Sequence, residues 1–478
     1  MDNQEDIRED LSSTPTGERK SDHSKNSVND RIQESLFSTP TGERLQIGIF
    51  GKVNAGKSSI LNAITDQDIA IVSKQEGTTT DPVRKAMELL PIGPVMIYDT
   101  PGLSDGSALG EKRIGKTEEV LRRIDVGLLV ISVDDLISLL PNGRRDPSGN
   151  PTAVEVSDPL DAEHGLLEHF RNRNLPILVI LNKTDRILQS EMIETAITLL
   201  AERLQLPPDR IIAFSCKTED VAEQAKGLRE KIAQLPAVGA NDTGSMVGTH
   251  ESRRYLVADL LNPGDVVILV IPIDESAPKG RLILPQQQVI RDALEAQAIV
   301  MAVKPRELTS AIAELKRPPK LVITDSQAFE EVAANLSEDI PLTSFSMLMA
   351  RYKGDLAWQA AGAARISELP DGAWVLISEG CTHHRQCGDI GTVKLPAWIE
   401  KYTGRQFHYE FTSGGEFPKD LSRFGLVIHC GGCTLPPREM AWRITAAREQ
   451  GVPITNYGTM IAYLHGILER AMAPLELN

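Results

Sequence analysis

The stretch Leu45-Gln-Ile-Gly-Ile-Phe-Gly51-Lys-Val-Asn-Ala-Gly-Lys-Ser58 joins an apolar run to a glycine-rich turn that opens a helical segment. Its second half is the phosphate-loop pattern: a glycine, four residues, then Gly-Lys-Ser, set between a strand and a helix. The glycines allow backbone N–H groups to close around phosphates at a helix N-terminus. We expect Lys57 to reach the β and γ phosphates and Ser58 to bind Mg²⁺.

Apolar runs alternate with helical segments on the C-terminal side of this turn. The runs are Leu45–Phe50, Val95–Tyr98, Gly127–Val133, Ile177–Leu181 and Arg210–Phe214. Helical spacing is found at Glu111–Ile124 and Glu191–Gln205. This alternation predicts an α/β fold, with a mostly parallel sheet and helices on both faces.

Three further motifs follow later strands in order. Asp99-Thr-Pro-Gly102 places Asp99 near the metal and the Gly102 N–H near the γ-phosphate. Asn182-Lys-Thr-Asp185 supplies a carboxylate that can accept both guanine N1–H and the exocyclic amine, a pair of donors that adenine lacks. Ser215-Cys-Lys217 follows the last strand and is similar to the loop that backs guanine. The sequence therefore predicts a site for GTP.

These motifs resemble those of the Era and TrmE-like branch of GTPases, over about residues 45–235. The resemblance makes Gly77-Thr-Thr-Thr-Asp81 the first switch, with Thr79 as a second Mg²⁺ ligand. It also implies a K⁺ site at Asn54 and Thr78, where the cation would neutralise transition-state charge. The alternative is that Asn54 only shapes the loop. Leu103 stands where many switch GTPases carry a water-orienting glutamine, so we expect slow hydrolysis.

The expected nucleotide site draws on all of these motifs. The residues expected to bind GTP are Gly51, Asn54, Ala55, Gly56, Lys57, Ser58, Ser59, Thr79, Asp99, Thr100, Pro101, Gly102, Asn182, Lys183, Asp185, Ser215, Cys216 and Lys217. Those expected to act in hydrolysis are Lys57, Ser58, Thr79, Asp99 and Gly102.

A second group of candidate ligands lies in the C-terminal region. Cys381-Thr-His383 and His429-Cys430-Gly-Gly-Cys433 each follow an apolar run, Trp374–Ser378 and Gly425–Ile428. If those runs are neighbouring parallel strands, both motifs emerge at the carboxyl edge of one sheet. Thiolates at such a site suit an iron–sulfur cluster or zinc, including a closed Cys3His zinc site. His384 and Cys387 are interpreted as bystanders.

This cysteine pattern is similar to the signature of the HydF family, which matures iron–iron hydrogenases. The resemblance covers residues 45–470 and includes the stretch Gly280-Arg-Leu-Ile-Leu-Pro-Gln-Gln-Gln288. It implies a 4Fe–4S cluster on Cys381, Cys430 and Cys433, with His383 or His429 as candidate fourth ligand. It also implies a homodimeric scaffold that carries a di-iron precursor, with two radical-SAM maturases and apo iron–iron hydrogenase as partners.

The family's order of parts matches the organisation expected here. Residues 1–44 are polar, carry the heptapeptide Ser-Thr-Pro-Thr-Gly-Glu-Arg twice, and predict a disordered tail. A GTPase domain is expected at 45–237, a linker and dimerisation domain at 238–318, and a cluster-binding domain at 319–478. The middle unit is expected to contain two strands around one helix, a small core that dimerisation would help to bury.

The composition limits which partners and which cellular compartment are expected. The 478 residues carry a net charge of −15, which disfavours nucleic acid as a partner. No apolar stretch of about 20 residues predicts a membrane span, and the acidic N-terminus indicates neither a secretory signal nor a transit peptide. Five cysteines, three of them in a Cys/His-dense region, favour metal binding in the cytoplasm over disulfides. The alternative function is an RNA- or ribosome-associated GTPase with a structural zinc site, and the C-terminal half lacks the Lys/Arg-rich groove that this would need.

Overall fold

The structure is a computed structural model. It describes residues 39, 41–65, 83–100, 117–137, 139, 158–187, 190–235, 255–273, 282–380 and 389–475. The chain divides into two units, Met1–Thr39 and Pro40–Asn478, and every element named below belongs to the second.

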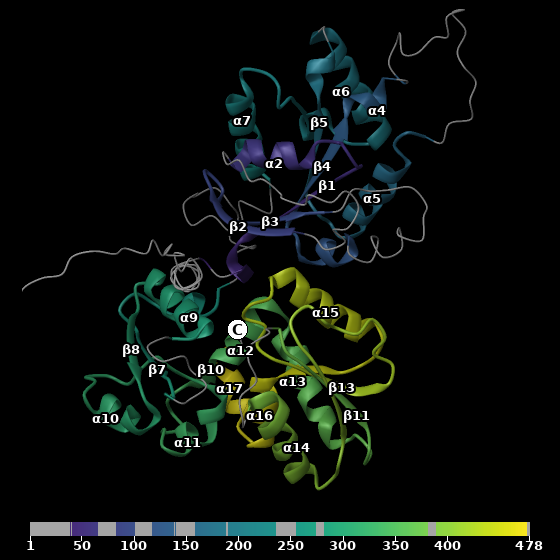
Figure 1. Ribbon diagram of the computed structural model, residues 1–478. Coiled ribbons are helices and arrows are strands. Elements are labelled where there is room, and N and C mark those ends of the chain that lie inside the picture. The colour runs from purple at the N-terminus through teal and green to yellow at the C-terminus, as the bar shows by residue number, and fades with distance from the viewer. Residues whose placement is uncertain are drawn as a thin grey trace, which may run out of the picture. The chain divides into compact units, whose positions relative to one another are not determined.

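The first sheet has six strands in the order β2-β3-β1-β4-β5-β6 (Figure 1). Its strands are β1 Leu45–Gly51, β2 Val83–Leu89, β3 Gly93–Asp99, β4 Val126–Ser132, β5 Ile177–Asn182 and β6 Ile211–Phe214. All neighbours pair in parallel except β2, which runs antiparallel to β3 at the edge. The predicted parallel α/β sheet is confirmed, whereas the edge strand β2 was not predicted.

Helices cover both faces of this sheet. One face packs against α2 Lys57–Thr65 and α7 Val221–Ala233, which bury Ile60 and Leu228 among the strand residues. The other packs against α5 Asp161–Asn172 and α6 Ser190–Leu204. Strands β1, β4 and β5 are buried along their whole length, because helices lie on both sides of them. The short elements of this part are η1 Thr41–Glu43, α4 Val133–Leu136, η2 Thr184–Arg186 and η3 Pro208–Arg210, with a further helical segment at residues 117–123.

The second sheet has four parallel strands in the order β10-β9-β7-β8. These are β7 Val266–Val270, β8 Ile299–Val303, β9 Leu321–Thr324 and β10 Leu342–Ser344. The helices of this part are η4 Ala258–Leu260, α9 Leu284–Glu295, η5 Pro305–Glu307, α10 Leu308–Ala313, η6 Ser326–Ala328, α11 Phe329–Ala334 and α12 Phe345–Lys353.

This sheet corrects the domain boundary expected at 318/319. That boundary falls between β8 and β9, two strands of one sheet, because β7 pairs with β8 on one side and with β9 on the other. The middle unit therefore has four strands rather than two. Apolar runs identify strands, but they do not reveal which sheet a strand joins.

The third sheet has four parallel strands in the order β12-β11-β13-β14. Its strands are β11 Trp374–Ser378, β12 His408–Thr412, β13 Phe424–His429 and β14 Ile454–Asn456. The helices are α13 Leu356–Ala364, η7 Arg365–Ser367, η8 Ile390–Lys394, α14 Leu395–Thr403, α15 Pro437–Glu449, α16 Tyr457–Leu464, α17 Leu468–Met472 and η9 Ala473–Leu475. Strands β11 and β13 are parallel neighbours, with Ser378 opposite His429, which is the condition for both cysteine motifs to emerge at one sheet edge.

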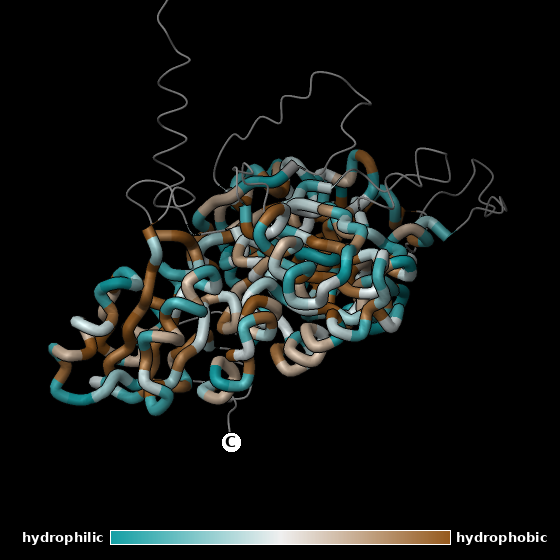
Figure 2. Tube along the Cα trace, turned by 90° about the horizontal axis from the view of Figure 1, so that it is seen from below, coloured by the Kyte–Doolittle hydropathy of each residue, from teal (hydrophilic) through white to brown (hydrophobic). Residues whose placement is uncertain are grey.

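Hydrophobic segments alternate with hydrophilic ones along the trace, as Figure 2 shows by colour. Strands and helices together supply most of the buried apolar residues in the described part of the chain. No helix in the described part of the chain is both long and apolar enough to cross a membrane.

Candidate functional site

The phosphate loop leaves β1 at the carboxyl edge of the first sheet and enters α2 at Lys57. Gly51 and Gly56 have φ values of +145° and +99°, which favour glycine. A Cβ on Gly56 would lie 2.1 Å from Asn182 Nδ2, so a side chain would also collide there. Asn54 adopts φ +63°, a left-handed conformation that asparagine tolerates better than most residues. The residue types at Gly51, Asn54 and Gly56 therefore permit the positive φ values that the phosphate loop adopts.

Lys57 and Asp99 lie together at this edge. The Lys57 ammonium donates to the carbonyls of Gly51 at 2.9 Å and Lys52 at 2.8 Å. Burial lowers the pKa of Lys57, and the nearby Asp99 carboxylate partly opposes that effect. Burial also raises the pKa of Asp99, which is opposed by Lys57, by Lys85 and by a hydrogen bond with Ser58. A hydroxyl and a carboxylate in contact beside a lysine are the donor set that Mg²⁺ and phosphate need.

The expected guanine loops converge next to this site. Asn182 is buried at the end of β5, and its Nδ2 donates to the phosphate-loop carbonyl of Ala55 at 2.8 Å. The Asp185 carboxylate accepts a hydrogen bond from Ser215 Oγ at 2.7 Å, and Ser215 Oγ in turn accepts from the Lys217 N–H at 3.2 Å. These contacts bring three of the four predicted motifs together. Lys183, at φ +63°, pairs with Asp134 at 3.1 Å.

Part of the expected nucleotide site lies outside the described residues. This applies to both switch segments, which contain Thr78, Thr79, Pro101, Gly102 and Leu103. Thr100 is described and buried, and its hydroxyl donates to the Ile49 carbonyl at 2.7 Å.

The second candidate site is the loop after β13, which we call the cysteine loop and define as residues 430–435. Its first N–H, from Cys430, donates to the Ser378 carbonyl of β11 at 3.0 Å. The Cys430 sulfur accepts N–H bonds from Gly380 at 3.0 Å and from Gly432 at 3.4 Å. Gly432 has φ +60°, which allows the chain to turn back on the sulfur. The loop thus wraps Cys430 in backbone donors.

Those N–H donors bear on the chemistry of the thiol. Burial raises the pKa of Cys430 to about 11, although the bonds from Gly380 and Gly432 oppose the rise. The thiol is therefore protonated at neutral pH unless a metal displaces its proton. Backbone donors directed at a cysteine sulfur are the environment that tunes cluster-binding thiolates.

His429 is the last residue of β13, directly before the cysteine loop, and it takes part in a buried hydrogen-bond network. Its Nε2 lies 2.9 Å from Arg443 Nη1, and its Nδ1 lies 2.7 Å from the Cys430 carbonyl oxygen. A guanidinium can only donate, so Nε2 accepts and Nδ1 carries the proton that it donates to the carbonyl. Burial and Arg443 lower the pKa of His429 to about 3, which keeps the ring neutral. In this arrangement neither ring nitrogen of His429 is free to bind a metal.

The other expected ligands, Cys381 and His383, lie outside the described residues. Within the described ranges no group of three His, Cys, Asp or Glu side chains forms a metal site. Gly380, the residue before Cys381, is described and contacts the Cys430 sulfur. The described part of the candidate cysteine site therefore consists of Cys430, Cys433 and the segment that ends at Gly380.

Two buried cations next to the cysteine loop were not predicted. Lys353 and Arg443 are 1% and 0% exposed. Burial lowers the pKa of Lys353 to about 8, against opposing effects from Cys433, Glu43 and Cys430. No local motif in the sequence marks either residue: Lys353 lies on α12, far before the cysteines along the chain, and Arg443 lies on α15, the helix that follows the cysteine loop.

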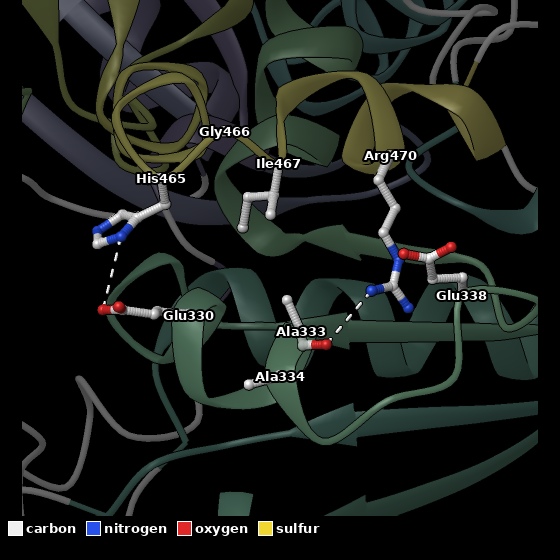
Figure 3. Close-up of a pocket in the computed structure, with 8 residues that line it drawn as sticks. All are labelled: Glu330, Ala333, Ala334, Glu338, His465, Gly466, Ile467 and Arg470. Atoms are coloured by element: carbon white, nitrogen blue, oxygen red, sulfur yellow. Dashed lines mark hydrogen bonds and ion pairs between the residues drawn. The ribbon is translucent and has the colours of Figure 1, made fainter.

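A cavity of about 410 Å³ lies between α11 and the α16–α17 turn (Figure 3). His465 pairs with Glu330 across it at 3.5 Å, and Arg470 donates to the carbonyls of Ala333, Leu336 and Ser337. These bonds satisfy carbonyls at and after the C-terminus of α11. None of the residues that line this cavity belongs to the nucleotide site or to the cysteine loop, and its contacts account for a structural role.

Family models match three consecutive parts of the chain. Residues 46–183 match a 50S ribosome-binding GTPase, residues 256–354 the hydrogen maturase F dimerization domain, and residues 357–474 the hydrogen maturase F tetramerization domain. The second match ends at 354, after all four strands of the second sheet.

Individual relatives match only the nucleotide-binding part. The tRNA modification GTPase MnmE of Cupriavidus metallidurans is 42% identical over 95 residues, which cover 20% of either chain. GTPase Der of Wolinella succinogenes is 33% identical over 144 residues, which cover 30% of this chain and 26% of that protein. The chain thus spans a fifth to about a quarter of the length of these relatives. A structure of an Aquifex aeolicus Era variant bound to GDP·AlF4⁻ aligns at a TM-score of 0.30 with 18% identity, covering 54% of this chain and 93% of that one.

Proposed function

The chain belongs to the hydrogen maturase F (HydF) family, and on that premise we propose that it is a GTP-hydrolysing scaffold for hydrogenase maturation. In this proposal it carries a 4Fe–4S cluster on Cys381, Cys430 and Cys433. It also holds the di-iron precursor that two radical-SAM maturases help to assemble, and it delivers that precursor to apo iron–iron hydrogenase in the cytoplasm.

One contact supports the cluster proposal most directly. The Gly380 N–H lies 3.0 Å from the Cys430 sulfur, and the next residue along the chain is Cys381. The segment that ends at Gly380 therefore lies beside the cysteine loop at one sheet edge, where ligands of parallel α/β sheets gather, and this supports the proposal that both cysteine motifs serve one site. The N–H donors around Cys430 fit a thiolate-bound cluster, which would supply an anchoring and electron-accepting iron centre when bound.

The engaged nitrogens of His429 bear on the fourth ligand. With Nε2 occupied by Arg443 and Nδ1 by the Cys430 carbonyl, His429 is the poorer candidate. We infer that His383, or an exchangeable external ligand, completes the cluster. We also infer that His429 orients the cysteine loop through its hydrogen bond to the Cys430 carbonyl.

The GTPase match supports GTP hydrolysis with Mg²⁺. We propose that Ser58 and Thr79 bind this ion and that Asp99, which contacts Ser58, lies near it. We propose that hydrolysis is slow, because Leu103 cannot orient the attacking water, and that K⁺ accelerates it through Asn54 and Thr78. Hydrolysis would bias two conformations of the switch segments and so time the release of the precursor.

The matched dimerization domain supports self-association, and its sheet offers a surface for it. Strand β8 is a sheet edge with exposed apolar residues, and Ile299 is 55% exposed. An edge of this kind readily pairs with another strand. We propose that β8 lies in the homodimer interface.

The decisive experiment is anaerobic purification followed by metal analysis and electron paramagnetic resonance. We expect iron with a reducible cubane signal in the wild-type protein. Cys430→Ser should lose that signal and retain GTP hydrolysis, whereas the matched control Cys387→Ser should keep both. Stoichiometric zinc in place of iron would contradict the scaffold proposal and favour the alternative, an RNA- or ribosome-associated GTPase with a structural zinc site.

A further inference from the structure

Lys353 ends helix α12, and its ammonium contacts the cysteine loop at three points. Its Nζ lies 3.0 Å from the Gly432 oxygen, 2.8 Å from the Cys433 oxygen and 2.9 Å from the Leu435 oxygen. An ammonium has three N–H donors and no acceptor, so three carbonyl oxygens match its donors in number. All three oxygens come from four consecutive residues.

These bonds fix the side of the loop opposite the sulfur. Gly432 directs its N–H at the Cys430 sulfur and its carbonyl at Lys353. The same carbonyl accepts the Leu435 N–H at 3.0 Å, which closes the turn. Removing the ammonium would take one hydrogen bond from each of the three carbonyl oxygens, leaving the Gly432 oxygen with the Leu435 N–H alone, and the Gly432 N–H would lose its fixed direction.

The buried positive charge of Lys353 favours an anionic group beside it. Its hydrogen-bond partners are neutral carbonyls, and taking an ammonium out of water without an anionic partner is unfavourable. The groups that interact with it electrostatically are Cys433, Glu43 and Cys430, in decreasing order. A metal centre bound by several thiolates is anionic, and it would add to the negative charge that Glu43 supplies near this lysine.

We propose that Lys353 is a positioning residue of the cysteine loop and that its fixed charge raises the reduction potential of the bound cluster. This inference rests on the proposed function. Reduction adds one negative charge to the cluster, and a buried cation nearby stabilises the reduced form more than the oxidised form.

The test compares the full-length wild type with Lys353→Met, Lys353→Gln and the exposed control Lys401→Met on α14. After anaerobic reconstitution, the cluster is titrated by potentiometry with paramagnetic resonance detection. Both Lys353 variants should lower the equilibrium constant for one-electron reduction about tenfold, a shift of about 59 mV to lower potential. The control should leave the potential unchanged. A role that is only structural would leave the potential of Lys353→Gln, which keeps N–H donors, at the wild-type value.

Hydrogen exchange in the metal-free protein tests separately whether Lys353 positions the cysteine loop. The Leu435 N–H should exchange slowly in the wild type and faster in Lys353→Met, with Lys353→Gln between them. If the Leu435 N–H of the wild type exchanges at the rate of an unfolded chain, the inference is overturned, and this measurement requires no variant. If Lys353→Met does not fold, Lys353→Gln carries the comparison.

The outcomes separate the inference from the proposed function. A wild type that binds no iron refutes the cluster proposal and with it the effect on potential, while the exchange data still decide the positioning role. A wild type that holds a cluster, with equal potentials in both Lys353 variants and the control, refutes only the inference.

Discussion

Replacing Arg443 by methionine removes the cation at the centre of the buried network behind the cysteine loop. Arg443 Nε and Nη2 donate to Glu439 Oε1 at 3.2 and 3.1 Å, and Nη2 donates to the Gly414 oxygen at 2.7 Å. Nη1 donates to His429 Nε2 at 2.9 Å and to Ser378 Oγ at 3.3 Å. Methionine is of similar length, so the change removes charge and donors while leaving much of the packing in place.

The expected loss of stability follows from burial. Glu439 is 2% exposed and His429 is 0% exposed, so water cannot replace the lost donors without a rearrangement. Removing one partner of a buried ion pair destabilises a protein by about 3–5 kcal/mol, because the other charge stays buried. With a urea dependence of about 2 kcal/mol per molar, the unfolding midpoint should fall by about 1.5–2.5 M.

Tryptophan fluorescence reports this loss for one part of the chain. All four tryptophans, at positions 358, 374, 398 and 442, lie within the matched C-terminal domain at 357–474. The matched control is Arg365→Met, which removes an ion pair to Glu368 whose side chains are 54% and 56% exposed. Exposed pairs contribute about 0–1 kcal/mol, so the control midpoint should move little. Equal midpoints for the two variants would refute the claim that burial makes the Arg443 network costly to break.

Four other expectations concern the nucleotide site and the sheet edge. Asp185→Asn should weaken GTP binding about 100-fold or more in calorimetry, since two hydrogen bonds to a carboxylate contribute roughly 1.5–3 kcal/mol each; unchanged affinity would contradict the guanine assignment. Lys57→Ala should abolish phosphate release and keep the iron content of the wild type, and loss of both would mean that the two sites are not separable. Hydrolysis should be faster in K⁺ than in Na⁺, and Asn54→Ala should remove that difference; equal rates in wild type would exclude the K⁺ role. Ile299→Lys on β8 should shift the protein toward monomer in sedimentation, and an unaltered dimer would place the interface elsewhere.

The sequence by itself determined the class of the first domain and predicted its nucleotide site. Each of its motifs is a contiguous turn at the end of a strand, so the residues expected to bind phosphate, or those expected to bind guanine, are neighbours in the chain as well as in space. Gly56 illustrates this, because its position in the pattern already requires the conformation and the close approach to Asn182 that the structure has. The described part of the site therefore followed from local pattern alone.

Only the tertiary structure decided how the C-terminal half is assembled. The strands at 321–324 and 342–344 join the second sheet by pairing with β7 and β9, a choice that no local periodicity encodes. The same holds for Lys353 and Arg443, whose partners in the cysteine loop and β13 are brought to them by helix packing. A buried cation looks like any surface lysine or arginine in a sequence, because its meaning depends on what the fold places around it.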